Sequence, residues 1–212
     1  GVSMDEAEPR FHESIEIMKK SWLNDERWSY EGKFWQFNDI IVEPPCAQKP
    51  HPPLWLAAGH TASIVTVANM GANLLLDQFS PTKSVLQRVQ TFREAQQNTK
   101  SNKVDGEIAL ARALYIAKNQ EDKMNAIEKR MNARARVDSL SQRPDGKNKA
   151  SIMIHKGADE ALLGALIGTV DEIVERLYQL KEGGINYILL VDAGGGVEGL
   201  RKFARDIEPQ IN

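Results

Sequence analysis

One short stretch of this chain places an apolar strand directly before a helix, and that order limits the folds the chain can adopt. Residues 52–58 read Pro-Pro-Leu-Trp-Leu-Ala-Ala and carry no charge. Such a run predicts a strand buried on both faces, as in a parallel sheet. The turn Gly-His-Thr-Ala-Ser at 59–63 follows, and the apolar residues after it predict a helix that ends at Gly71. A strand, a turn and a helix in this order form the repeating unit of α/β folds.

The rest of the chain repeats this alternation. Further strands are expected at residues 72–76, 107–116 and 187–191, where apolar and β-forming residues gather. Helices are expected after each strand and at two other places. They begin at Ser80-Pro81, run from Glu121 to about Val137, follow Thr169 as far as Gly183-Gly184, run from Val197 to Ile207, and follow Ser3 near the N-terminus.

This alternation predicts parallel βαβ units with right-handed crossovers. Before the first unit come only the N-terminal helix and an aromatic stretch, residues 28–37, that reads as a small hairpin or an extended cover. Four such units are too few to close an eight-stranded barrel, which takes about 250 residues.

The helix from Glu121 also carries a methionine stripe and several basic residues. Met124, Ile127 and Met131 recur at helical spacing and are interpreted as core contacts. The basic side chains are spread around the helix and are expected to be solvated, not to form a binding patch; they are Lys129, Arg130, Arg134 and Arg136. Residues 139–156 are polar and lack periodicity, which predicts a loop excursion.

Two turns are candidates for binding an anion. The turn at 59–63 places backbone N–H groups and small hydroxyls at a helix N-terminus, where a phosphate is stabilised. The second turn, Asp192 to Gly196, is rich in glycine, but its spacing is neither the dinucleotide fingerprint nor a Walker loop. We favour a flexible loop at the rim of the sheet for that segment.

Composition excludes several classes of function. A net charge of −2 gives no electrostatic basis for binding nucleic acid or a membrane surface. No apolar run approaches the ~18 residues of a membrane span, and no leader is visible. The single cysteine, Cys46, leaves no internal disulfide and fits a reducing cytoplasm. No metal site is expected, because His12, His51 and His155 are scattered without a second ligand at metal spacing.

Several motifs in one order bring a family to mind. Arg-Phe-His-Glu-Ser at 10–14 opens a helix, Trp-Ser-Tyr-Glu-Gly-Lys-Phe-Trp follows at 28–35, and the strand-turn-helix segment occupies 52–71. Ile-Gly-Thr-Val-Asp-Glu at 167–172 and Gly-Ile-Asn-Tyr-Ile-Leu-Leu at 184–190 complete the set. Together they resemble the bacterial luciferase-like, flavin-dependent monooxygenases. The resemblance implies a TIM (β/α)8 barrel of which residues 1–212, as a single domain, are the C-terminal half with about four βα units.

The resemblance also implies a chemistry. Family members use reduced FMN, usually delivered by a separate flavin reductase, together with O2 to oxidise a small organic substrate. On that basis the FMN phosphate is held by the turn after the first strand, and the flavin ring lies beside the end of the next strand. The implied cofactor-binding residues are Gly59, His60, Thr61, Ser63, Asp77 and Gln78. Other members often have serine where this chain has Gly59 or His60, so a hydroxyl donor is replaced here.

Other interpretations stay open. His60 has a second reading as a general acid or base, although no partner carboxylate can be named for it. The superfamily also includes deazaflavin-dependent reductases, and a non-catalytic half-barrel could bind a phosphate-bearing ligand or a protein partner. The resemblance assigns no catalytic residue within this chain, because those residues are expected on the missing strands. Family members are commonly homo-oligomers, and an open half-barrel exposes an apolar edge.

Overall fold

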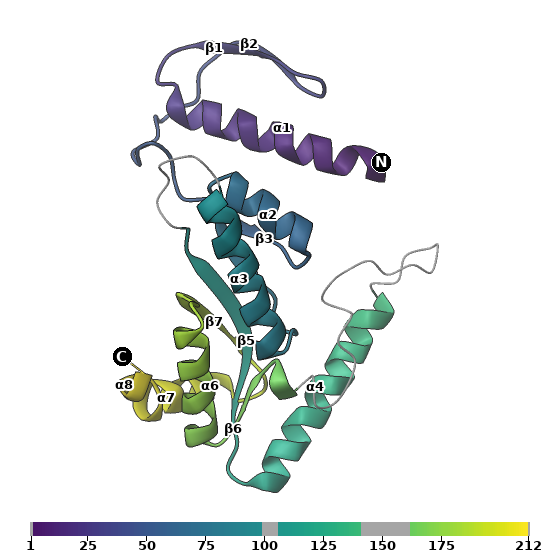
Figure 1. The fold of residues 1–212 in the computed structure, drawn as a ribbon, viewed down its shortest axis with the longest axis vertical. Coiled ribbons are helices and arrows are strands. Elements are labelled where there is room, and N and C mark those ends of the chain that lie inside the picture. The colour runs from purple at the N-terminus through teal and green to yellow at the C-terminus, as the bar shows by residue number, and fades with distance from the viewer. Residues whose placement is uncertain (1, 99–105, 141–161, 212) are drawn as a thin grey trace. The chain divides into compact units, whose positions relative to one another are not determined.

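The structure, a computed structural model, describes residues 2–98, 106–140 and 162–211. The chain divides into two compact units, Gly1–Leu54 and Trp55–Asn212. Figure 1 shows the helices and strands of both units.

The first unit is a long helix with a hairpin. Helix α1 (Met4–Leu23) starts at Ser3, whose hydroxyl accepts the N–H of Asp5, so the predicted cap is confirmed. Strands β1 (Trp28–Glu31) and β2 (Gln36–Ile40) pair antiparallel, which confirms the hairpin. The Glu13 carboxylate of α1 accepts the backbone N–H groups of Phe34 and Trp35 and so ties the hairpin turn to the helix.

The second unit contains a parallel sheet of five strands. The strands are β3 (Trp55–Ala57), β4 (Asn73–Leu76), β5 (Ile108–Ile116), β6 (Leu166–Gly168) and β7 (Tyr187–Asp192). Strand β5 is the centre of the sheet: it pairs with β4 through residues 108–110, with β7 through 109–114 and with β6 through 114–116. The four predicted strands are confirmed. Strand β6 was not predicted, since three residues before a helix cap show no period.

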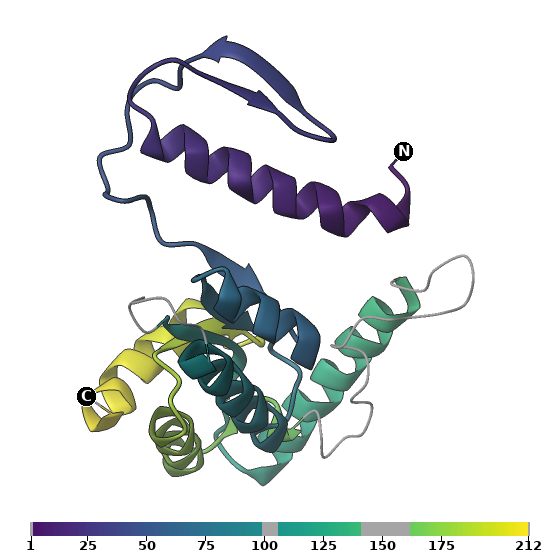
Figure 2. The same ribbon diagram turned by 45° about the horizontal axis from the view of Figure 1, so that its top comes forward.

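Helices follow these strands. They are α2 (Thr61–Asn69), α3 (Thr82–Asn98), α4 (Gln120–Leu140), α6 (Val170–Glu182), α7 (Gly196–Asp206) and the short α8 (Glu208–Ile211). Helices α2 and α3 lie side by side, as Figure 2 also shows. Thr169 caps α6 in a capping box with Glu172, which confirms the predicted start. Helix α4 continues through residues 139 and 140, where a loop was expected to begin, and residues 141–156 lie outside the described residues.

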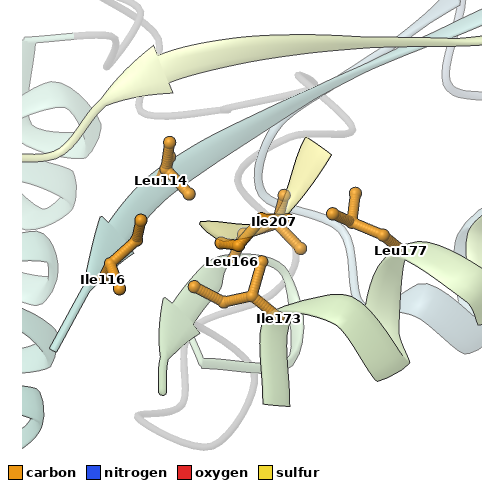
Figure 3. Packing of buried hydrophobic residues seen from close by; sticks show 6 residues of the cluster. All are labelled: Leu114, Ile116, Leu166, Ile173, Leu177 and Ile207. Carbon is orange, nitrogen blue, oxygen red and sulfur yellow. The ribbon is translucent and has the colours of Figure 1, made fainter. Parts of the chain in front are cut away.

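The helix-covered face of the sheet holds the core. Alternate residues of β5 point to this face and pack against α6 and the end of α7 (Figure 3). The buried members of this cluster are Leu114, Ile116, Leu166, Ile173, Leu177 and Ile207. Each has at most 8% of its surface exposed, so this layer fixes the sheet on the helices.

The opposite face of the sheet corrects the sequence prediction. The apolar run at 52–58 was expected to form a strand buried on both faces, but Trp55 of β3 is 36% exposed, and Tyr187 and Leu189 of β7 are each 47% exposed. The reason is topological: β3 pairs only with β4 among the described strands, and α6 and α7 pack on the other face. On the exposed face, α4 packs near Ala113 and Ile167, away from Trp55. In a closed barrel this face is filled by side chains from strands across the barrel.

Candidate functional site

A cavity of about 420 Å³ opens where β3 and β4 end. Its lining residues come from β3, β4, β5 and β7 and the turns after β3 and β4: Ala57, Ala58, Gly59, Leu75, Leu76, Asp77, Gln78, Phe79, Ala111 and Leu189. The strand register explains why they meet. Ala57 pairs with Leu75, Leu76 pairs with Leu110, and Ala111 pairs with Leu189, so the lining residues of the four strands lie within two residue positions of one another along the sheet.

The cavity joins two of the turns that the resemblance had marked. Gly59 lies at its edge, and Asp77 and Gln78 lie at the end of β4 on the same wall. This places three of the six predicted cofactor residues around one space. The carboxyl end of a parallel sheet is also where α/β proteins place their ligands.

The other three predicted residues form the N-terminus of α2 and do not line the cavity. His60 is the N-cap, and its side chain makes no capping hydrogen bond. Thr61 and Ser63 occupy the first turn and are exposed. No acidic residue stands in that turn, so nothing there opposes an anion at the positive end of the helix. A phosphate site at this turn remains a prediction.

Both carboxylate oxygens of Asp77 are engaged by donors of the chain itself. Its Oδ1 accepts the backbone N–H groups of Phe79 at 2.7 Å and Ser80 at 2.8 Å, and its Oδ2 accepts the Ser80 hydroxyl and Arg88 Nη1. Burial alone raises the pKa of Asp77, but these donors and Arg88 outweigh it and hold the pKa below its usual value. The carboxylate is therefore ionised and fully engaged in holding the turn.

A buried arginine lies behind that turn, and sequence reasoning missed it. Arg112 of β5 is 1% exposed, and its guanidinium donates to the carbonyl oxygens of Asp77 at 3.2 Å and Ser80 at 2.9 Å. Burial lowers the pKa of Arg112 to about 10. A signal existed in the sequence, since residues 108–116 are otherwise apolar or tyrosine and Arg112 is their only charge.

The basic residues of α4 correct a second expectation. Arg130 and Arg134 were expected to be solvated, but Arg134 is 9% exposed, and both guanidinium groups lie over the ring of Phe79 at 5.4 and 5.3 Å. Arg130 also donates to the Gln78 carbonyl oxygen at 2.7 Å. Burial and Arg134 lower the pKa of Arg130 to about 10. Of the predicted core contacts on this helix, Ile127 is buried and Met131 packs beside it, but Met124 is 54% exposed.

These α4 residues line a second cavity of about 400 Å³ beside the first. Gln78 and Phe79 belong to both cavities, and Ala113, Val191 and Asp192 complete the wall from β5 and β7. The loop after β4 thus separates the two spaces.

The glycine turn after β7 is not built to hold a phosphate. Oδ1 of Asp192 accepts the backbone N–H groups of Gly194, Gly195 and Gly196 at 3.2, 2.9 and 2.9 Å. The donors that an anion would need are thus engaged by the chain's own carboxylate.

Within the described ranges, no three His, Cys, Asp or Glu side chains gather in a way that could hold a metal ion. No helix in these ranges is both long enough and apolar enough to cross a bilayer.

Comparison with known proteins places the chain. The model of the family "Luciferase-like monooxygenase" matches residues 1–187. The chain is similar to the FMNH(2)-dependent dimethylsulfone monooxygenase of Pseudomonas putida, with 24% identity over 87% of this chain and 53% of that protein. It is also similar to the oxygenase component of the flavin-dependent trigonelline monooxygenase of Acinetobacter baylyi, with 26% identity over 58% of this chain and 33% of that protein. The chain therefore spans about half, or less, of the length of these curated relatives.

A solved structure shows the same fold. The chain superposes on the structure of an F420-dependent secondary alcohol dehydrogenase with a TM-score of 0.77 and 16% sequence identity. The match covers 100% of this chain and 64% of the dehydrogenase chain. The predicted luciferase-like barrel, of which this chain contains only a part, is confirmed. The neighbours include FMN-dependent monooxygenases and F420-dependent enzymes. With a family model that covers most of its length, the chain belongs to the luciferase-like monooxygenase family.

Proposed function

We propose that this chain forms the C-terminal half of an FMN-dependent monooxygenase and supplies its phosphate site and one wall of its flavin cavity. The single observation that carries the proposal is that Gly59, before α2, and Gln78, after β4, line the same cavity at the carboxyl end of the sheet. The similarity to two flavin monooxygenases, one of them named FMNH(2)-dependent, supports FMN as the cofactor.

The residues of the cavity fit a flat aromatic ring. Its volume of about 420 Å³ falls in the usual range for small-molecule sites, ~300–1,000 Å³. Ala57, Ala58 and Ala111 keep the wall shallow, and Leu75 and Leu189 make it apolar. Such a wall keeps water away from a reacting centre. The amide of Gln78, which both donates and accepts hydrogen bonds, is the polar group we propose to orient the ring.

The N-terminus of α2 is the proposed phosphate site. Its first-turn N–H groups have no acceptor within the helix, and the hydroxyls of Thr61 and Ser63 add neutral donors. His60, the N-cap of α2, is the further side chain that we propose as a donor to the same anion. The bound flavin, received reduced from a separate reductase, supplies the electrons that activate dioxygen for attack on a small organic substrate. The protein's part is to bind, to orient and to exclude water.

The test compares flavins that differ only in the phosphate. The natural polypeptide that carries this chain is titrated with FMN and with riboflavin. We expect FMN to bind at least about tenfold more tightly, because one hydrogen bond to a charged group is worth ~1.5–3 kcal/mol. In the double variant His60→Asp with Ser63→Ala this advantage should vanish, while riboflavin affinity is kept. His12→Asp in α1 makes the same charge change elsewhere and should leave the advantage intact.

Other results would redirect the proposal. Equal affinity for FMN and riboflavin in the unchanged protein would remove the phosphate site from α2. Saturable binding of F420 without binding of FMN would favour the deazaflavin-dependent reductase. Binding of neither, together with a tight protein complex, would favour the non-catalytic half-barrel. If FMN binds, turnover with a flavin reductase, NADH and a panel of small sulfur and nitrogen compounds, which the names of the relatives suggest, defines the substrate.

A further inference from the structure

We infer that Arg112 is a positioning residue: from behind the sheet it fixes the Asp77–Ser80 loop that forms the cavity wall. The inference rests on the proposed function, since it concerns the same cavity. Arg112 does not itself line the cavity. Its neighbours Ala111 and Ala113 line the two cavities, and because side chains alternate along a strand, Arg112 points to the opposite, helix-covered face.

The contacts of Arg112 span the loop. Nη1 donates to the carbonyl of Asp77 at 3.2 Å and to that of its own neighbour Ala111 at 3.3 Å, and Nη2 donates to the carbonyl of Ser80 at 2.9 Å. The two loop carbonyls are three residues apart, and Gln78 and Phe79 lie between them on the cavity wall. One rigid planar group therefore holds both ends of the segment that faces the ligand.

The residues around Arg112 argue against a role in packing alone. Its neighbours on the same face of β5 are Leu110 and Leu114, both at most 3% exposed, so an apolar side chain suits this layer. Burying a guanidinium among them is unfavourable, as the lowered pKa of Arg112 also shows. What a leucine or methionine cannot supply is the set of donors to the loop carbonyls. The effect of the guanidinium is thus on loop conformation.

Two other side chains complete the arrangement. Arg88 of α3 binds the Asp77 carboxylate and the Ser80 hydroxyl, and Arg130 of α4 binds the Gln78 carbonyl. Arg112 is the member of this set that reaches both ends of the loop through the main chain. Its loss should change how the wall is presented while the sheet itself persists.

The test uses Arg112→Met with a matched control. Arg176 of α6 makes the same kind of contact, donating to the carbonyls of Ala165 and Ile167 at 3.0 and 3.2 Å, and these residues line neither cavity. Two quantities are measured in the natural polypeptide: amide hydrogen exchange at Phe79 and Ser80, and the Kd values of FMN and riboflavin.

We expect Arg112→Met to speed exchange at these two amides, and to raise both Kd values, by about tenfold each. The affinities for FMN and for riboflavin should fall by the same factor, because the substitution changes the cavity wall beside the flavin ring and not the phosphate site. Arg176→Met should leave these quantities at the unchanged protein's values. Arg112→Lys keeps one donor group, so its exchange rates and Kd values should lie between those of the unchanged protein and those of Arg112→Met. It replaces the methionine variant if that variant does not fold.

Several results would overturn the inference. Unchanged exchange at Phe79 and Ser80 would show that Arg112 does not order the loop. Faster exchange with unchanged flavin affinity, or an equal loss of affinity in Arg176→Met, would show a role in stability alone. If the unchanged protein binds no flavin, the proposed function fails, and the exchange comparison alone then decides the role of Arg112 in ordering the loop.

Discussion

The carboxylate of Asp77 lies 2.7 Å from Nη1 of Arg88, and each side chain is only 13% exposed. This ion pair links the end of β4 to α3. Because the same carboxylate also accepts two backbone N–H groups of the loop, it fixes the segment that separates the two cavities. The charge of the residue that the family resemblance placed beside the flavin thus holds the loop.

Asp77→Asn should lower the free energy of unfolding at pH 7 by roughly 2 kcal/mol, since a charged acceptor is lost from a largely buried network. The pKa of Asp77 is lower in the folded than in the unfolded state, where it is about 3.9. The stability that this group contributes is therefore complete well above pH 4 and is lost as pH falls through the folded-state pKa. Urea unfolding at pH 7, 5, 4 and 3 should show the gap between unchanged protein and variant closing at the acid end.

The matched control is Asp25→Asn. Asp25 pairs with Lys49 at 3.2 Å, but both side chains are more than half exposed, so solvent screens the pair. Its unfolding curves should follow the unchanged protein at every pH. A gap for Asp77→Asn that persists undiminished at pH 3 would contradict the assignment of a lowered pKa to that carboxylate.

Gly164→Ala should destabilise the second unit and disturb the same loop. A Cβ at Gly164 would clash with the Phe79 carbonyl oxygen and lie 2.9 Å from its carbon, and a backbone group cannot move aside cheaply. The cost of such overpacking is about 1–3 kcal/mol. Gly199 in α7 has open space around its Cβ position, so Gly199→Ala should be neutral or slightly stabilising. Thermal unfolding of both variants checks this, and equal Tm values for the two would refute the close approach.

Glu13→Ala should loosen the hairpin of the first unit by about 1.5–3 kcal/mol, because its carboxylate accepts N–H groups of Phe34 and Trp35, both at 3.0 Å. Glu13→Gln retains an acceptor oxygen and should lose less. Limited proteolysis within residues 28–40 measures the opening of the hairpin. If the alanine and glutamine variants are cleaved as slowly as the unchanged protein, the tie between α1 and the hairpin turn is not a stabilising one.

Sequence reasoning located most elements of this fold because their signals are local. Ser3 and Thr169 are caps whose hydroxyls bond within their own helix turn, and the strands 72–76, 107–116 and 187–191 are apolar runs flanked by turn residues. Strand β6 escaped because three residues carry no period. The exposure of Trp55 escaped because an apolar run does not say how many faces of a sheet are covered.

The site could be predicted only in part, for a related reason. Gly59, Asp77 and Gln78 were predicted through a family pattern, and the strand register brings them to one cavity. Which atoms of Asp77 are engaged depends on Arg88, eleven residues away, and on the turn's own geometry. Contacts with a loop 32 to 55 residues earlier in the chain determine the roles of Arg112, Arg130 and Arg134. From the helical pattern alone, Arg130 and Arg134 were predicted to be exposed to solvent.

The most direct test of the account is amide hydrogen exchange of the natural polypeptide with and without FMN. A ligand that binds the cavity and the N-terminus of α2 slows exchange where it contacts or orders the backbone. We predict slower exchange in peptides that cover residues 57–64 and 75–80, with little change across the glycine turn at 192–196. Saturable FMN binding that leaves residues 57–64 and 75–80 unprotected would contradict the placement of the flavin at this end of the sheet.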